Sequence, residues 1–252
     1  FLFTLRKLLA CDAIDEVFID SECEEILEIG KAAGATPLKR DPALASNDTD
    51  GHALFWNEVQ QVDADIYVQA LCTSPFVRSD TIKSAIKELQ DDASIDSVVL
   101  GQRQHMYTWS DGRPDYGDEA IPNSSDLPWI DREGMSLYVV RRDAAMKTHR
   151  RIGDRPRMVF GRPLEVIDVD TEADFELAES IAAGLRAAEG KRFRFLSLFL
   201  NSAVLSDVLD ELGHDGVLLP KFQPNFPDAK IFGRVRPLSI RACEPGESPR
   251  SI

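Results

Sequence analysis

Short apolar runs alternate with stretches of helical periodicity through most of this sequence. The apolar runs predict strands at 14–20, 37–42, 64–71, 96–102, 134–140 and 163–169. The amphipathic stretches predict helices at 1–11, 22–34, 50–62, 79–90, 143–150 and 172–188, the fourth of them capped by Ser79 or Asp80. Strands that alternate with helices of this length are typical of βαβ units. We therefore expect an α/β domain with a mainly parallel sheet.

The alternating pattern breaks near Gly190, where we place a boundary between a first domain, 1–189, and a second region, 190–252. The second region holds one amphipathic helix at 202–213 and one strand at 230–240. A unit with one helix and one strand buries too little apolar surface to be stable alone. We therefore interpret 190–252 as a partial second α/β domain.

Composition excludes several classes of protein. The chain of 252 residues has a formal net charge of −14, which argues against nucleic acid as a main partner because phosphate contacts need clustered Lys and Arg. No apolar run approaches the roughly 18 residues of a membrane span, and the opening FLFTLRKLLACD is too quickly charged for a signal peptide. The four cysteines lack CxxC spacing and are typical of reduced thiols. We expect a cytoplasmic protein that binds neither nucleic acid nor membranes.

Two aspartates, Asp168 and Asp170, lie at the end of the last predicted strand of the first domain. Residues two apart on a strand share a face, and Thr171 with Asp174 forms a capping box for the next helix. Ligands of α/β sheets bind at the carboxyl ends of strands. These aspartates are therefore the best candidates for a functional site. Either they bind a hard cation such as Mg²⁺, which takes carboxylates together with water and phosphate oxygens, or one of them caps the helix or pairs with an arginine.

Two further loops follow predicted strands. Arg40 leads into a loop of small and polar residues that suits recognition of a base or an anion, although an ordinary capped loop is the simpler explanation. Thr73 and Ser74 lie in the next strand-end loop, where their hydroxyls either bind a substrate or shape a turn before Pro75. In a parallel sheet these loops share one edge with Asp168.

Residues 110–131 contain many turn formers and predict a long loop. Before this loop Arg103, His105, Tyr107 and Trp109 alternate, which fits either the lining of a pocket for a polar ring or one face of an exposed hairpin. The sequence shows no Ser-His-Asp or Cys-His pattern, and neither GxxxxGK[ST] nor GxGxxG.

Four segments in chain order carry a resemblance: IDEVFIDSECEEILEIGKAAGA, RDPALASNDTDGHAL, TSPF and EVIDVDTEADFELAE. They are similar, in the same order, to the strand-and-helix pattern and the RP-x-x-LA-x-D, TSPLR and IDIDT-x-x-D-x-x-x-AE motifs of the cytidylyltransferases that make CMP-activated acidic sugars. CMP-N-acylneuraminate synthetases belong to that family. The resemblance covers about residues 1–188 and implies a nucleotidyltransferase α/β fold of the Rossmann-like, GT-A-like kind.

The resemblance also implies a reaction, in which the anomeric hydroxyl of a nonulosonic-type sugar attacks the α-phosphate of CTP and releases pyrophosphate. By analogy Asp168 and Asp170 hold Mg²⁺ against the phosphates and the attacking oxygen. Arg40 and the backbone near Ala45 contact cytosine by the same analogy. Gln69 lies two residues before the position that helps to hold the sugar in the family. With Thr73 and Ser74 it makes up the expected sugar site. Homodimers are usual in the family, but the sequence itself neither supports nor excludes one.

Three departures from the family pattern bear on activity and specificity. The family opens with a strand and a Gly/Ser/Arg/Lys-rich loop around the triphosphate, whereas this chain starts at the helix that follows. We therefore expect little or no transferase activity from this chain, and pyrophosphate release from CTP would refute that expectation. Leu71 and Cys72 replace the Gln-Pro that precedes TSP in sialate enzymes. Glu133 stands near the asparagine of the family's NGA-x-YI strand, so the identity of the sugar stays open.

The tail, from LFLNSAVL at 198–205 to RACEPGE at 241–247, is similar to the beginning of the RraA-like family, whose members share a fold with class II pyruvate aldolases. The similarity covers about 60 residues and stops before the family's Gly-Asp and Arg-Asp site motifs, so it assigns no catalytic residue. The whole chain thus resembles a cytidylyltransferase fused to the start of an aldolase-like domain.

Three other functions stay open at this point. The first is a nucleotidyltransferase for another nucleotide or sugar. Nucleotide-dependent thermal shifts would distinguish it from a CTP-dependent enzyme. The second is a non-catalytic module that provides an assembly or regulatory surface for the aldolase-like region. The third places the chemistry in the C-terminal region, with pyruvate as a product, which an aldolase assay would decide.

Overall fold

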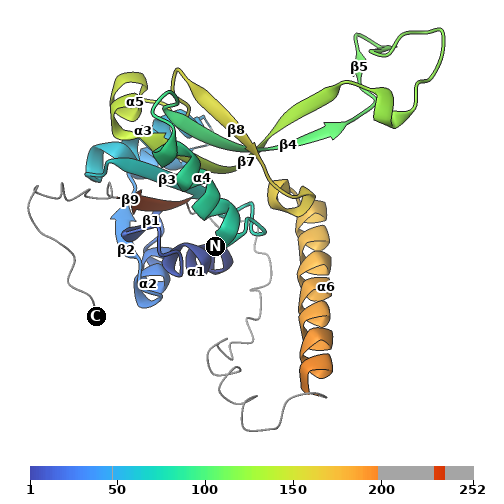
Figure 1. Cartoon of the computed structure of the whole chain (residues 1–252). Coiled ribbons are helices and arrows are strands. Elements are labelled where there is room, and N and C mark those ends of the chain that lie inside the picture. The colour runs from blue at the N-terminus through green and yellow to red at the C-terminus, as the bar shows by residue number, and fades with distance from the viewer. Residues whose placement is uncertain (47, 198–229, 236–252) are drawn as a thin grey trace, which may run out of the picture. The chain divides into compact units, whose positions relative to one another are not determined.

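One sheet organises most of the chain (Figure 1). A computed structural model describes residues 1–46, 48–197 and 230–235, and in these residues seven strands pair in the order β2-β1-β9-β3-β7-β4-β8. Their bounds are β1 (Glu16–Ser21), β2 (Thr36–Lys39), β3 (Ile66–Leu71), β4 (Ser97–His105), β7 (Trp129–Arg141), β8 (Pro156–Phe160) and β9 (Lys230–Val235). β1, β2, β3, β4 and β8 share one direction, and β7 and β9 run against them. The expected α/β fold with a mainly parallel sheet is confirmed.

Helices cover both faces of this sheet because alternate strand residues point to opposite sides. Ile19 and Val68 belong to a core packed by α1 (Leu2–Leu9), α2 (Glu24–Ala32) and α4 (Ser79–Asp91), while Phe18 and Tyr67 belong to a second core packed by α3 (Gly51–Gln61) and α5 (Arg142–Thr148). A sixth helix, α6 (Glu172–Ser197), follows the segment that contains Asp168. The predicted helices at 1–11, 22–34, 50–62, 79–90, 143–150 and 172–188 are thereby confirmed. In the described part of the chain no helix is long and apolar enough to cross a membrane.

β9 confirms the strand expected in the tail, over 230–235, and pairs antiparallel with both β1 and β3. A Cβ added at Gly233 would lie 3.2 Å from a methyl carbon of Ile14 and 3.3 Å from Cβ of Val68. β9 therefore packs closely between its neighbours, and glycine is the residue that fits at this position. The helix predicted at 202–213 and most of the RraA-like stretch lie outside the described residues.

The contacts divide the chain into two compact units, Phe1–Ile167 with Pro227–Ile252, and Asp168–Phe226. The first unit contains the sheet, and the second contains α6. We describe each unit by itself. The assignment of 1–189 to a cytidylyltransferase-like domain and of 190–252 to a second domain stays a prediction.

The prediction of a strand at 163–169 is wrong. Residues Pro163–Val166 form a 3₁₀ turn, and the sheet edge is instead formed by β8, which lies seven residues earlier along the chain and pairs with β4. The buried Glu165 side chain explains the turn, because its two oxygens accept hydrogen bonds from the backbone N–H of Arg78 (2.9 Å) and of Arg162 (2.8 Å). β8 was missed because proline opens it and its side chains are only partly buried, as is usual for an edge strand.

The long loop predicted at 110–131 is shorter than expected. β4 and β7 remain paired out to His105 and Trp129, and β5 (Trp109–Ser110) with β6 (Arg113–Pro114) forms a small hairpin beyond them. Of the two interpretations of the alternating residues 103–109, the structure shows the exposed hairpin. Figure 1 shows this arm extending from the sheet.

The predicted cap of α4 is also wrong, because Arg78 and not Ser79 or Asp80 is its N-cap residue. Arg78 makes no side-chain capping bond, and its backbone N–H is bound by Glu165 instead. A side chain distant in the sequence thus fixes the start of this helix.

Candidate functional site

The loops after β1, β2 and β3 lie along one edge of the sheet, which we call the carboxyl edge. β1 ends at Ser21, β2 at Lys39 and β3 at Leu71. Asp20 and Leu71 both pair with Lys230 of β9, so the ends of β1 and β3 are level with each other. In parallel α/β sheets this is the edge at which ligands bind.

Five residues predicted to contact substrates lie on or beside the carboxyl edge: Arg40, Ala45, Gln69, Thr73 and Ser74. Arg40 follows β2, Ala45 closes the short 3₁₀ turn Pro42–Ala45, and Gln69 lies near the end of β3. Thr73 and Ser74 form the turn after β3. The structure brings these residues to one edge, and their binding roles stay predictions.

Arg40 forms a buried ion pair with Asp20 of β1. Its Nε and Nη2 donate to Oδ2 of Asp20 at 3.0 and 2.9 Å, and Nη2 also donates to the Asp20 carbonyl at 3.2 Å. Nη1 lies 3.4 Å from Oε2 of Glu22. Arg40 is 2% exposed and Asp20 is fully buried. The guanidinium therefore ties the loop after β2 to β1, and its predicted contact with cytosine remains untested.

Gln69 lies beneath α3, fully buried. Its Nε2 donates to Oε2 of Glu58, which is also fully buried, at 2.7 Å. Oε1 of Gln69 is buried and has no hydrogen-bond partner among the described residues. Tyr138 of β7 pairs with Gln69 across the sheet. Gln69 thus has one buried acceptor without a described partner, and its sugar-binding role stays a prediction.

The turn after β3 is held by Lys7 of α1. Nζ of Lys7 donates to the carbonyl of Pro75 at 2.6 Å and to that of Val77 at 2.8 Å. Ser74 is fully buried within this turn, and its Oγ has no hydrogen-bond partner in the described part of the chain. Lys7 therefore ties α1 to this turn, and the turn holds a buried hydroxyl whose binding role stays a prediction.

Burial lowers the pKa of Lys7 to about 8, which outweighs the opposite effect of the nearby Glu165 carboxylate. Between pH 8 and pH 10.5 the unfolded chain therefore binds more protons than the folded chain, so the free energy of unfolding rises with pH. We expect wild type to gain about 2–3 kcal/mol relative to Lys7→Met between pH 7.5 and pH 10. Urea unfolding at both pH values measures this difference. Lys83→Met, which replaces an exposed lysine and keeps Lys7, should gain stability with pH much as wild type does. Equal pH dependence in wild type and Lys7→Met would contradict it.

A second group of side chains surrounds the start of α3. The Asp50 carboxylate caps this helix by accepting from the backbone N–H of His52 (2.7 Å) and of Ala53 (2.9 Å). The Arg151 guanidinium lies over the ring of Tyr138, with Cζ 4.3 Å from the ring centroid. Burial lowers the pKa of His52, and the charge of Arg151 lowers it further. His52 is therefore neutral at pH 7.

An irregularity in β7 shapes this group. The β4–β7 register shifts between Val99 and Gly101, and Met135 has a φ of 49°, which only a constrained backbone imposes on such a residue. Tyr138 Oη donates to the Glu133 carboxylate across this bulge. The sequence pointed to Glu133 only through the family pattern. Arg151 gave no signal, because HRRIGDR reads as an ordinary basic surface loop.

The predicted metal ligands Asp168 and Asp170 belong to the second unit. Asp168 is half-buried and Asp170 is exposed. The capping box is confirmed: the Asp174 carboxylate accepts from Thr171 N–H at 2.9 Å, and Asp174 N–H donates to Thr171 Oγ1 at 3.3 Å. Asp174 therefore serves the helix. No strand carries Asp168 and Asp170, so the shared strand face expected for them is absent, and their metal-binding role stays a prediction.

No group of three or more His, Cys, Asp or Glu side chains is placed to hold a metal ion within the described residues. Two carboxylates nevertheless fit Mg²⁺, which keeps several waters and binds substrate phosphates directly. A Mg²⁺ ion held by Asp168 and Asp170 would depend on such oxygens for its remaining positions.

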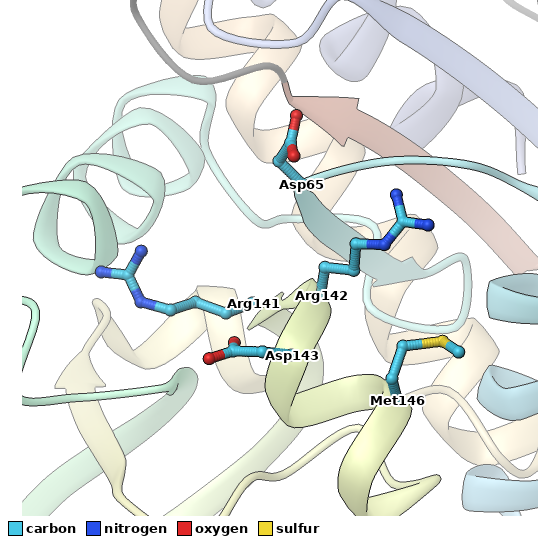
Figure 2. A pocket seen from close by; sticks show the side chains of 5 residues that line it. All are labelled: Asp65, Arg141, Arg142, Asp143 and Met146. Carbon is cyan, nitrogen blue, oxygen red and sulfur yellow. The ribbon is translucent and has the colours of Figure 1, made fainter.

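A hollow on the surface lies at the opposite edge of the sheet, lined by Asp65, Arg141, Arg142, Asp143 and Met146. Figure 2 shows that the side chains of Arg141 and Arg142 point away from each other. Arg141 donates to the carbonyls of residues 89, 92 and 95, and Arg142 pairs with Asp63. These cations are occupied, so we assign the hollow no function.

Comparison with known structures identifies the class of this fold. The chain is similar to a CMP:2-keto-3-deoxy-manno-octonic acid synthetase complexed with CTP, with 15% identity and a TM-score of 0.53, over 73% of this chain and 87% of the other. It is similar to 4-diphosphocytidyl-2C-methyl-D-erythritol synthase from Anaerococcus prevotii, with 12% identity and a TM-score of 0.54, over 72% and 84%. No curated protein matches the sequence. These likenesses show an α/β fold of the nucleotidyltransferase kind.

The sequence carries the identification further. The model of the family described as Cytidylyltransferase matches residues 2–184, more than half of the chain. The chain belongs to the cytidylyltransferase family. The expected transfer of a cytidylyl group from CTP is thereby confirmed at the level of the family.

Proposed function

We propose that this protein transfers CMP from CTP to a hydroxyl group of an acidic, nonulosonic-type sugar, with release of pyrophosphate. The observation that carries the proposal is the family match over residues 2–184, which contains all the motifs of the resemblance. The structural neighbour described as a CMP:2-keto-3-deoxy-manno-octonic acid synthetase supports an acidic acceptor. Cytosine and the sugar would bind along the carboxyl edge.

In this reaction the sugar oxygen forms a bond to the α-phosphorus as the bond to the pyrophosphate oxygen breaks. The protein's part is to position both substrates and to neutralise charge. The loop after β2, from Arg40 to Ala45, would hold cytosine. Gln69, Thr73 and Ser74 would orient the sugar hydroxyl, which must lose its proton as the new bond forms. Mg²⁺ bound by Asp168 and Asp170 would supply charge neutralisation at the phosphates.

We further propose that the protein forms a homodimer through the arm of β4, β5, β6 and β7. The arm exposes large apolar side chains at Met106, Tyr107, Trp109, Ile121 and Trp129. Solvent-exposed apolar groups at this density are typical of interaction sites. Light scattering would test the dimer. Trp109→Ser with Ile121→Ser should give monomers, and an unchanged mass would contradict the proposal.

The cellular setting follows from the thiols. Cys11 and Cys23 carry free thiols, which supports work in a reducing compartment such as the cytoplasm. Fusion to an RraA-like domain is part of the same proposal, and its residues fall mostly outside the described part of the chain.

Thermal unfolding in the presence of Mg²⁺ and each nucleoside triphosphate tests the nucleotide. We expect CTP to raise Tm well above the effect of ATP, GTP or UTP at equal concentration, because binding to the folded state stabilises it. Equal shifts for the four nucleotides would contradict the proposal. The absence of any shift would favour the non-catalytic module instead.

A further inference from the structure

Among the residues whose burial is described, two arginines have nearly buried side chains, and they differ in their partners. Arg40 is bound by Asp20 and Glu22. Arg151, only 7% exposed, forms no ion pair among the described residues, and its Nε is buried there without a hydrogen-bond partner. Nη2 approaches only the sulfur of Met135, at 3.8 Å. A buried cation without a counter-charge is costly, so Arg151 lacks an anion.

The position of the guanidinium makes the missing counter-charge more costly. A Cβ added at Gly51, the first residue of α3, would lie 2.6 Å from Cζ of Arg151 and 2.7 and 2.8 Å from Nη1 and Nη2. The cation therefore lies against the positive end of an 11-residue helix. Glycine at position 51 leaves the space that the guanidinium occupies.

The neighbouring acids offset the charge of Arg151 only in part: it contributes to lowering the pKa of Asp50, but no ion pair forms. The exposed Asp50 carboxylate is engaged by the first backbone N–H groups of α3, and no ion pair joins it to Arg151. The Glu133 carboxylate accepts from Tyr138 Oη. His52 is neutral, so it neither adds to nor offsets the charge. The Tyr138 ring stabilises the cation through its face, but it does not replace a charged partner.

We infer that Arg151 at the start of α3 binds an oxyanion of a substrate and is a specificity-determining residue of this protein. The inference deepens the proposed function and rests on it for the identity of the ligand. Two substrate groups share the required chemistry: the carboxylate of an acidic sugar and the phosphates of CTP. Tyr138 lies under the guanidinium and is the register partner of Gln69 on the neighbouring strand β3. Arg151 therefore lies beside the expected sugar site.

The test compares Arg151→Met with Arg150→Met. Arg150 is the neighbouring cation in the sequence, but it is 47% exposed and pairs with Asp154. The first probe is sodium sulfate against sodium chloride at equal ionic strength, followed by thermal unfolding. We expect sulfate to raise the Tm of wild type and of Arg150→Met and to have no such effect on Arg151→Met. This probe needs neither nucleotide nor sugar, so it succeeds or fails independently of the proposed function.

The second probe is calorimetric titration with CTP and Mg²⁺, and separately with 3-deoxy-manno-octulosonic acid and its neutral methyl ester. We expect Arg151→Met to weaken one of the two anionic ligands about tenfold or more. If only the acid binds more weakly, Arg151 binds the carboxylate of the sugar. In that case the methyl ester should already bind weakly to wild type. A loss confined to CTP assigns a phosphate. Equal binding of sulfate, CTP and acid by Arg151→Met and Arg150→Met would overturn the inference.

The thermal stability of Arg151→Met distinguishes a binding role of Arg151 from a structural one. Because the guanidinium has no ion-pair partner in the described part of the chain, Arg151→Met should have a Tm no lower than that of wild type without added anion. Gly51→Ala keeps the arginine but places a methyl group where the guanidinium lies, and it should weaken the same ligand. A large fall in the Tm of Arg151→Met, with sulfate binding intact in Gly51→Ala, would show that Arg151 is structural.

Discussion

Replacing Asp168 or Asp170 with asparagine should remove the Mg²⁺-dependent part of CTP binding. Each substitution keeps the size of the side chain and removes one of the two carboxylates proposed to hold the cation. Outer-sphere partners of bound metals contribute 10–100-fold to affinity, so a direct ligand should contribute about 100-fold or more. Calorimetric titration of CTP at saturating Mg²⁺, and again with EDTA, measures the change.

Glu172→Gln is the matched control for these variants. Glu172 is exposed in the first turn of α6, so the substitution removes one negative charge from the same segment without touching the aspartate pair. It should leave CTP binding unchanged. If Glu172→Gln and Asp168→Asn weaken binding equally, the pair acts only through general charge and the proposed metal site is refuted.

Replacing Arg40 with methionine should destabilise the fold by about 3–5 kcal/mol, because it leaves the fully buried Asp20 carboxylate without its cation. Chemical denaturation measures the free energy of unfolding. The double variant Asp20→Leu with Arg40→Met should recover much of the loss, since it removes both charges.

Lys39→Met is the control for Arg40. Lys39 precedes Arg40 and pairs with Glu24, but both side chains are exposed, 48% and 75%. Exposed pairs of this kind contribute about 0–1 kcal/mol, so the variant should unfold almost as wild type does. A loss of less than about 1 kcal/mol in Arg40→Met would show that the pair does not hold the loop after β2.

The order of helices and strands could be predicted because its signals are local. Amphipathic periodicity and capping residues gave the helices, and the capping box of Thr171 and Asp174 formed as expected. The 163–169 segment failed because its apolar residues suit a strand, whereas the turn depends on Glu165 binding the N–H of Arg78, 87 residues earlier. Periodicity cannot detect such a contact. For the same reason the partners of β9 could not be predicted.

Some residues of the candidate site could also be predicted from the sequence, and others could not. Residues at strand ends, such as Arg40 and Ser74, could be predicted because a parallel sheet brings its carboxyl ends together. Asp20 was missed as the partner of Arg40, since the sequence does not indicate which residue pairs with a carboxylate inside an apolar run. Arg151 was missed because it follows Arg150 in a charged loop, and only the folded chain shows that one is buried and the other exposed.

The proposed transfer itself can be measured in a single turnover, with the protein in excess over CTP. This design detects even a slow transfer. Protein, Mg²⁺, CTP and a panel of nonulosonic-type acids are incubated together, and mass spectrometry follows the conjugate of CMP with the acid. We predict a conjugate with CTP alone among the nucleotides, formed with one equivalent of pyrophosphate and absent in Asp168→Asn. This result would also refute the expectation, drawn from the sequence, of little or no activity. Conjugates formed equally from any nucleotide, or CTP bound without any conjugate, would contradict the proposed function.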